Sequence, residues 1–224
     1  MGTLLAFTAL CTWGIGDFLI QRSSRRFGSV ITLFSITGLA AIVLLPWAWP
    51  EIISTVTDLA KLKILLLTSG AILVAALLNF ESLRRGKISV IEPIYAGEIP
   101  VAAGLAAIFL GETLSPVEVG LITLLVVSIA VLSTESIKDL RSIKFEPGLG
   151  FAIGGTLAMG VANYLYAAGG RLTSVIMINW FTDAVMALAM VAVILYKRNW
   201  MVVLESWRTH PKLLLTMSVA DNIA

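Results

Sequence analysis

A few carboxyl groups lie inside long apolar runs of the chain, and they are its best candidates for chemistry. Asp183 is near the middle of the run 173–196, and Glu98 is near the middle of the run 89–110. A charged side chain at the bilayer centre costs about 2.5 to 3.5 kcal/mol on insertion scales, so its presence there suggests a function. Such an acid could take and release a proton or pair with a cationic substrate. The alternative is a structural hydrogen bond in a packed bundle.

Polar and aromatic neighbours extend these two positions into a candidate substrate or ion site. Tyr95 lies one turn before Glu98 and offers a hydroxyl, while Asn179 lies one turn before Asp183. Trp180 could stack on a substrate, although aromatic residues in helices more often pack in the core or against lipid. Asp17, near the end of the run 3–20, is a further candidate, unless it turns toward Gln21 or Arg22 at the helix end.

Two other acids have more ordinary explanations in the sequence. Ser89 and Glu92 have the spacing of a capping box, which predicts that Glu92 caps a helix and leaves a substrate role as the weaker alternative. Glu81, with Asn79, is close to two arginines and is predicted to form an interfacial cap. Ser115 and Glu118 repeat the capping-box spacing before the run 116–134.

Several classes of function lack their residues. Cys11 is the single cysteine and His210 the single histidine, so neither a thiol site nor a histidine metal pair can form. No serine-hydrolase GxSxG is present, and Gly86-Lys87 lacks the upstream glycine of a nucleotide-binding loop. A net charge of +2 gives no reason for nucleic-acid binding. We therefore expect no cofactor, no metal and no enzymatic activity.

The elements that carry the acids are membrane helices. The chain has 224 residues, of which 58% are hydrophobic and 13% charged, against about a quarter charged in soluble proteins. Seven charge-poor runs have the roughly 17 to 25 residues that a bilayer requires. An eighth run begins at Lys212 and reaches the last residue, Ala224, so we expect a C-terminally truncated helix. The seven runs are 3–20, 28–49, 62–81, 89–110, 116–134, 148–168 and 173–196.

Basic residues in the connections predict the orientation. Thirteen lysines and arginines fall on one face, after the first, third, fifth and seventh runs, and three fall on the other. Because basic loops stay in the cytoplasm, this distribution places the N-terminus outside it. The predicted location is the cell membrane, with multiple passes.

An internal repeat relates the two parts of the chain. A shift of 146 residues places Asp17 over Asn163 and Trp13-Gly14 over Met159-Gly160. Five helices separate the copies, so the second copy enters the membrane from the opposite side. Inverted repeats of this kind are typical of transporters, in which a site between the halves opens to either side. The predicted organisation is a first repeat at 1–135, a linker at 136–147 and an incomplete second repeat at 148–224.

Three features of this pattern resemble the EamA-like transporters of the drug/metabolite transporter superfamily. They are Trp13-Gly14 in the first helix, Pro100 in the fourth, and Leu110-Gly111-Glu112 followed by Thr113-Leu114 before the fifth. The resemblance implies an all-α bundle of ten helices in two inverted five-helix halves, of which this chain holds seven and part of an eighth. Members of that family usually have both ends in the cytoplasm, so the orientation stays open.

The predicted function is secondary active transport of a small metabolite, amino acid or drug-like solute by alternating access, with protons as the candidate coupling ion. The alternative is a membrane scaffold or receptor that transports nothing, which leaves the buried acids and the repeat without a purpose. The predicted partners are a small-molecule substrate, protons and the lipid bilayer. The candidate binding residues are Asp17, Tyr95, Glu98, Asn163, Asn179, Trp180 and Asp183.

Overall fold

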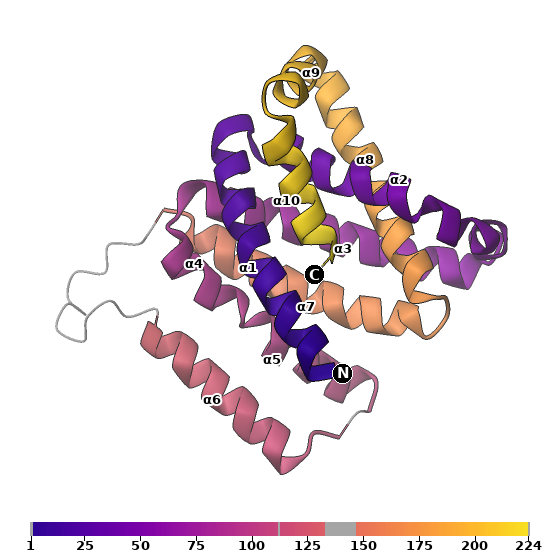
Figure 1. Cartoon of the computed structure of the whole chain (residues 1–224). Coiled ribbons are helices and arrows are strands. Elements are labelled where there is room, and N and C mark those ends of the chain that lie inside the picture. Colours follow the sequence, from indigo (N-terminus) through magenta and orange to yellow (C-terminus); the bar gives the residue numbers. More distant parts are fainter. Residues whose placement is uncertain (1, 112, 133–146, 224) are drawn as a thin grey trace.

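The computed structural model describes residues 2–111, 113–132 and 147–223, and within these ranges it contains helices and no strands (Figure 1). The helices are α1 (Gly2–Phe27), α2 (Ser29–Val56), α3 (Leu59–Arg85), α4 (Ile88–Tyr95), α5 (Glu98–Phe109), α6 (Pro116–Leu132), α7 (Leu149–Gly170), α8 (Val175–Tyr196), α9 (Trp200–Thr209) and α10 (Pro211–Ile223).

Five segments of the described chain are long and apolar enough to cross a membrane. They are α2, α3, α4 with α5, α7 and α8, and α6 adds a shorter apolar helix. Their outer surfaces carry large apolar side chains such as Ile42, Ile108 and Leu188, which are 69–74% exposed. Exposure of so much apolar surface is unfavourable in water, whereas contact of the same surface with lipid hydrocarbon is not. The prediction of an all-α polytopic membrane bundle is confirmed.

Several buried hydroxyl groups are satisfied within their own helices. The buried hydroxyls of Thr37 and Ser69 donate to the carbonyls of Leu33 and Leu65, four residues earlier, at 2.9 and 2.7 Å. This local bond removes the cost of an unpaired hydroxyl away from water. The bundle is thus apolar outside and partly polar inside.

The predicted single helix at 89–110 is wrong in one respect, because the structure divides it into α4 and α5 at Ala96 and Gly97. Pro100 has no N–H to bond the Ala96 carbonyl, and the Gly97 amide turns back to the carbonyl of Ile94 at 3.0 Å. The break places Glu98 in the first turn of α5.

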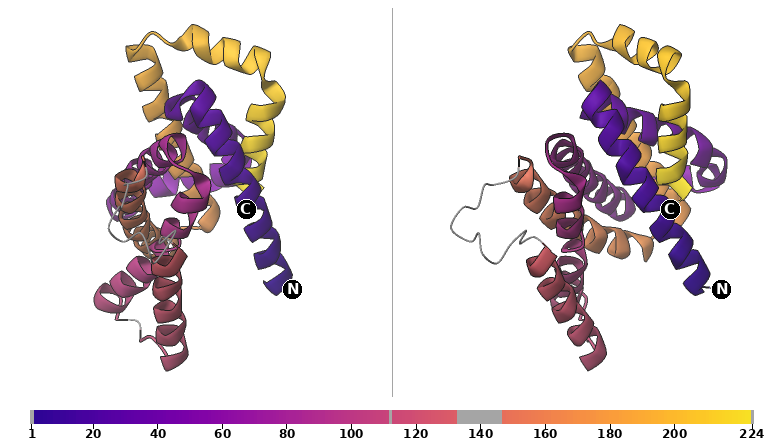
Figure 2. Two further views of the ribbon diagram at one scale, coloured as in Figure 1. Left: turned by 90° about the vertical axis from the view of Figure 1, so that its left-hand side faces the viewer. Right: turned by 60° about the vertical axis from the view of Figure 1, so that its left-hand side comes forward.

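The connection between the apolar run 173–196 and the last run contains the ten-residue helix α9, which the charge-poor runs do not predict. Val203 is 3% exposed and faces the bundle, whereas Met201 is 74% exposed. This amphipathic division suits a helix lying at a membrane surface. In Figure 2, α9 joins α8 to α10 across one end of the molecule.

The two predicted capping boxes have different outcomes. Ser115 and Glu118 form theirs: the Ser115 amide donates to Glu118 Oε2 at 2.7 Å, and the Glu118 amide donates to Ser115 Oγ at 3.3 Å. The box at Ser89 and Glu92 is wrong, because α4 begins one residue before Ser89, and the amides of Val90 and Ile91 bond to the Lys87 carbonyl. Glu112 and residues 136–146 of the predicted linker lie outside the described residues.

Two helix pairs, α3 with α7 and α2 with α8, have the most extensive packing. α3 lies along α7, α2 along α8, and α1 beside α10 (Figure 1). Around these pairs, α4 and α5 pack on α7, and α6 contacts α4 and α5.

Glycines on α7 permit its closest contacts. A Cβ added at Gly155 would lie 3.2 Å from the amide nitrogen of Asn79, and one at Gly160 would lie 2.6 Å from Cβ of Val101. A Cβ at Gly150 would meet nothing within 4 Å. Small residues therefore bring α7 against α3 and α5 at these two positions.

Candidate functional site

Asp17 interacts with most of the half-buried acids between the helices. The preceding residue, Gly16, is buried against α10, where an added Cβ would lie 3.7 Å from the backbone nitrogen of Asp221. This close approach of α1 and α10 brings the carboxyl groups of Asp17 and Asp221 within electrostatic range of each other. Asp183, on α8, is in turn within range of Asp221.

Two further acids reach Asp17 from the broken helix. The Glu92 carboxyl group, on α4, interacts with that of Asp17, and its Oε1 atom is buried without a hydrogen-bond partner. Glu98, at the start of α5, interacts with the Asn163 side chain and is within range of Asp17. The helix break at Ala96 and Gly97 therefore lies between Glu92 and Glu98, which both interact electrostatically with Asp17.

We refer to Asp17, Glu92, Glu98, Asp183 and Asp221 together as the acid cluster. Its members come from five different helices, α1, α4, α5, α8 and α10. The ion pairs in the described part of the chain are those of Glu81 with Arg84 and Arg85, so no cluster acid has a basic partner there. Neighbouring carboxyl groups in a poorly solvated region cannot all be ionised, and protons or cations must neutralise some of them.

The remaining sequence candidates have other positions. The Tyr95 hydroxyl donates to the carbonyl of Asn79 at 2.7 Å and contacts Ser82, which joins α4 to α3. The Trp180 indole donates to the Ala41 carbonyl at 3.0 Å and joins α8 to α2. Asn179 is exposed. The structure thus brings Asp17, Glu98, Asn163 and Asp183 into one electrostatic network, with Tyr95 at its edge, and places Asn179 and Trp180 elsewhere.

Asp221 was not a sequence candidate, and Glu92 was predicted mainly as a helix cap, with a substrate role as the weaker alternative. Glu92 has capping-box spacing, and only the position of the first helical residue reveals that it turns inward. Asp221 lies in the last run of the sequence, where the helix face could not be assigned. A usable signal was present for both, since each is an acid within an apolar run.

The contact of Trp180 leads to a prediction about its role. Trp180→Phe should lower the free energy of unfolding by at least about 0.5 to 1.5 kcal/mol, because the part-buried hydrogen bond to the Ala41 carbonyl is lost and phenylalanine fills less space than the indole. The half-saturation concentration for transport should not change. Thermal unfolding in detergent and concentration-dependent uptake check the two parts, and a raised half-saturation concentration would instead place the indole at the substrate.

Among the described residues, no group of three or more histidine, cysteine, aspartate or glutamate side chains is arranged to hold a metal ion. The carboxyl groups of the cluster interact in pairs, through Asp17 and Asp221, and do not converge on one point as metal ligands do.

The fold and the cluster define an integral membrane protein with ionisable groups between its helices. The chain belongs to the EamA-like transporter family, whose family model matches residues 1–134. It is therefore a membrane transporter of the drug/metabolite superfamily, with a small-molecule substrate and a lipid bilayer around it. No curated protein sequence matches the chain.

Proposed function

We propose that the protein is a secondary active transporter that works by alternating access between two inverted halves. The halves are residues 1–135 and 148–224, joined by residues 136–147. In this mechanism one half rocks against the other, and a site between them faces each side of the membrane in turn.

The pairing of helices is the observation that carries the proposal. The shift of 146 residues equates α1 with α7 and α2 with α8, and with two residues inserted Lys63-Ile64 lies over Pro211-Lys212, which equates α3 with α10. If the halves are related by a two-fold axis, exchanging them turns the pair α1 with α10 into the pair α7 with α3, and leaves α2 with α8 unchanged. The pairs α3 with α7 and α2 with α8 are the two most extensive helix contacts of the described structure, and α1 with α10 follows, equal to α5 with α7. The agreement supports an interface between exchangeable halves.

The acid cluster lies across this proposed interface. Asp17, Glu92 and Glu98 belong to the first half, and Asp183 and Asp221 to the second. Rocking of the halves would change the separation between the two groups of acids and their access to water. We propose that protons occupy the cluster in one part of the cycle and that a substrate, or a cationic group of it, displaces them in another.

The scaffold or receptor alternative predicts none of these features. A passive helix bundle can be built without unpaired acids between its helices, and replacing them with apolar residues would stabilise it. The two hypotheses therefore differ in whether the acids are needed for flux or only tolerated in the structure.

Counterflow in liposomes tests the proposal. Vesicles containing the full-length protein are loaded with an unlabelled solute, and the entry of labelled external solute is followed for amino acids, nucleosides and cationic drugs. An alternating-access carrier should give transient accumulation of label for at least one solute, which protein-free vesicles lack. Absence of counterflow for every solute that the purified protein binds would favour the scaffold or receptor.

A further inference from the structure

A pocket of about 280 Å³ opens where the ends of α1 and α3 meet the start of α2 and the end of α8. We call this region the basic end, because Arg25, Arg84, Arg85 and Lys197 lie there. The pocket is lined by residues 27–31, 81, 84, 194, 197 and 199, so it shares no residue with the acid cluster.

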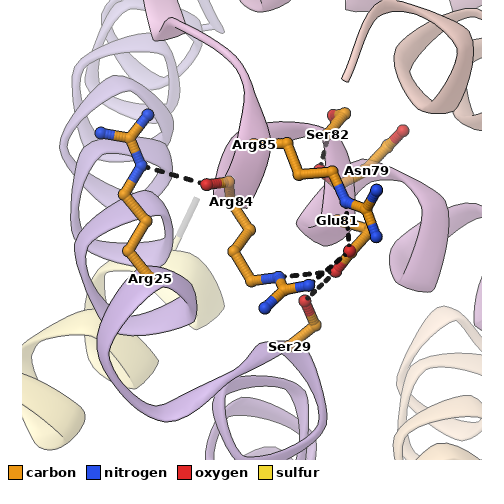
Figure 3. A network of polar contacts seen from close by, with 7 residues as sticks. All are labelled: Arg25, Ser29, Asn79, Glu81, Ser82, Arg84 and Arg85. Carbon is orange, nitrogen blue, oxygen red and sulfur yellow. Dashed lines mark hydrogen bonds and ion pairs between the residues drawn. The ribbon is translucent and has the colours of Figure 1, made fainter. Parts of the chain in front are cut away.

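Positive charge is in excess around this pocket. Glu81 is its one acidic lining residue, and the carboxylate is already held by Arg84 at 2.6 and 2.8 Å and by Arg85 at 2.5 Å (Figure 3). The hydroxyl of Ser29 donates to it at 3.2 Å. Lys197 is exposed and has no ion pair in the described part of the chain. Two arginines thus share one carboxylate and Lys197 adds a third positive charge to the pocket, which leaves capacity for an anion.

The backbone on one wall adds to this capacity. Gly28 adopts a positive φ of 86° and separates α1 from α2, and no side chain caps the new helix. The amide of Thr32 donates to the Gly28 carbonyl at 3.2 Å, and the amides of residues 29–31, in the first turn of α2, precede this bond. Residues 29–31 line the pocket, and the first amides of α2 carry the positive end of the helix dipole.

The surroundings of the pocket favour a lipid over a soluble anion. The side chains of Ile31 and Ile194 make part of its wall apolar. Beside it, Leu195, Trp200 and Met201 are 41–74% exposed at the end of α8 and along α9. Exposed apolar residues next to basic ones are the pattern of a membrane surface that holds anionic headgroups.

We propose that this pocket binds the phosphate group of an anionic phospholipid, with the acyl chains against the exposed apolar residues of α8 and α9. In this proposal Lys197 is the basic residue whose charge serves the phosphate alone, because Arg84 and Arg85 also form ion pairs with Glu81. This inference does not depend on the transport mechanism proposed above.

The test is lipid binding to the delipidated full-length protein in detergent, measured by native mass spectrometry. Phosphatidylglycerol should bind more tightly than phosphatidylcholine. Lys197→Gln should weaken phosphatidylglycerol about fivefold, the usual contribution of one basic residue beside anionic lipid, and Lys197→Arg should retain it. Lys63→Gln is the matched control, because Lys63 is an exposed lysine at the other end of α3.

Two results would overturn the proposal. One is equal affinity of Lys197→Gln and the unmodified protein for phosphatidylglycerol, or an equal loss in Lys63→Gln. The other is binding of inorganic phosphate at this pocket without preference for phosphatidylglycerol over phosphatidylcholine, which would identify a free anion as the ligand. Because Lys197 is exposed, a folding failure is not expected in any of these variants, and thermal unfolding confirms that.

Discussion

Asp17→Asn is expected to abolish accumulation of substrate driven by a pH gradient. Asp17 is the acid within reach of Glu92, Glu98 and Asp221, so it connects both groups of the acid cluster. Asparagine keeps the size and polarity of the side chain but cannot carry a proton. The initial rate of pH-driven uptake in liposomes should fall about tenfold or more, because the acid cluster loses the member that connects its two groups.

Asp58→Asn is the matched control for that variant. Asp58 is an exposed acid that caps α3 by accepting from the amides of Ala60 and Lys61, at 2.9 and 3.3 Å. Asparagine caps a helix as well as aspartate does, so neither stability nor uptake should change. Normal pH-driven uptake by Asp17→Asn, in a protein that folds normally, would reduce Asp17 to a structural role.

The second large effect is expected from Gly160→Leu. Gly160 is buried, and an added Cβ would lie 2.5 Å from Cγ1 and 2.6 Å from Cβ of Val101, and 3.1 Å from the Glu98 carbonyl oxygen. Because Cβ of Val101 is fixed to the α5 backbone, a rotamer change of Val101 cannot relieve this contact. We expect the free energy of unfolding to fall by about 1 to 3 kcal/mol, as overpacked cores do. Unfolding in mixed micelles, followed by circular dichroism, measures this.

Gly150→Leu provides the comparison on the same helix. Gly150 is exposed, with nothing within 4 Å of an added Cβ, so its variant should be unchanged or up to about 1 kcal/mol more stable. Equal destabilisation of the two variants would show that α7 does not pack on α5 as described.

The presence of the membrane helices was predictable from the sequence, because a helix that crosses about 30 Å of hydrocarbon requires a long run of apolar residues. The interruptions within helices were less predictable from the sequence. Pro100 predicts a bend near Glu98, yet the full break at Ala96 and Gly97 also depends on the amide of Gly97 turning to Ile94. α9 was missed since a short amphipathic helix with Glu205 and Arg208 resembles a polar loop in composition.

The candidate site was predictable as a set of residues but not as an arrangement. Burial costs identify Asp17, Glu98 and Asp183 without a structure, because each stands in an apolar run. Their grouping depends on helix packing, such as Gly16 against α10, which sequence spacing does not encode. For the same reason the Gly150 and Gly154 pair, a GxxxG pattern, is less closely packed than Gly155 and Gly160.

The account rests on proton exchange at acids between two halves of a carrier, and one measurement addresses it most directly. Full-length protein is reconstituted in liposomes, and uptake of a solute that gives counterflow is followed with and without a pH gradient across the membrane. We predict accumulation above the external concentration that requires the gradient, collapses when a protonophore removes it, and is lost in both Asp183→Asn and Glu98→Gln. Uptake that equilibrates at the same rate with or without the gradient, and is unchanged in both variants, would contradict the account.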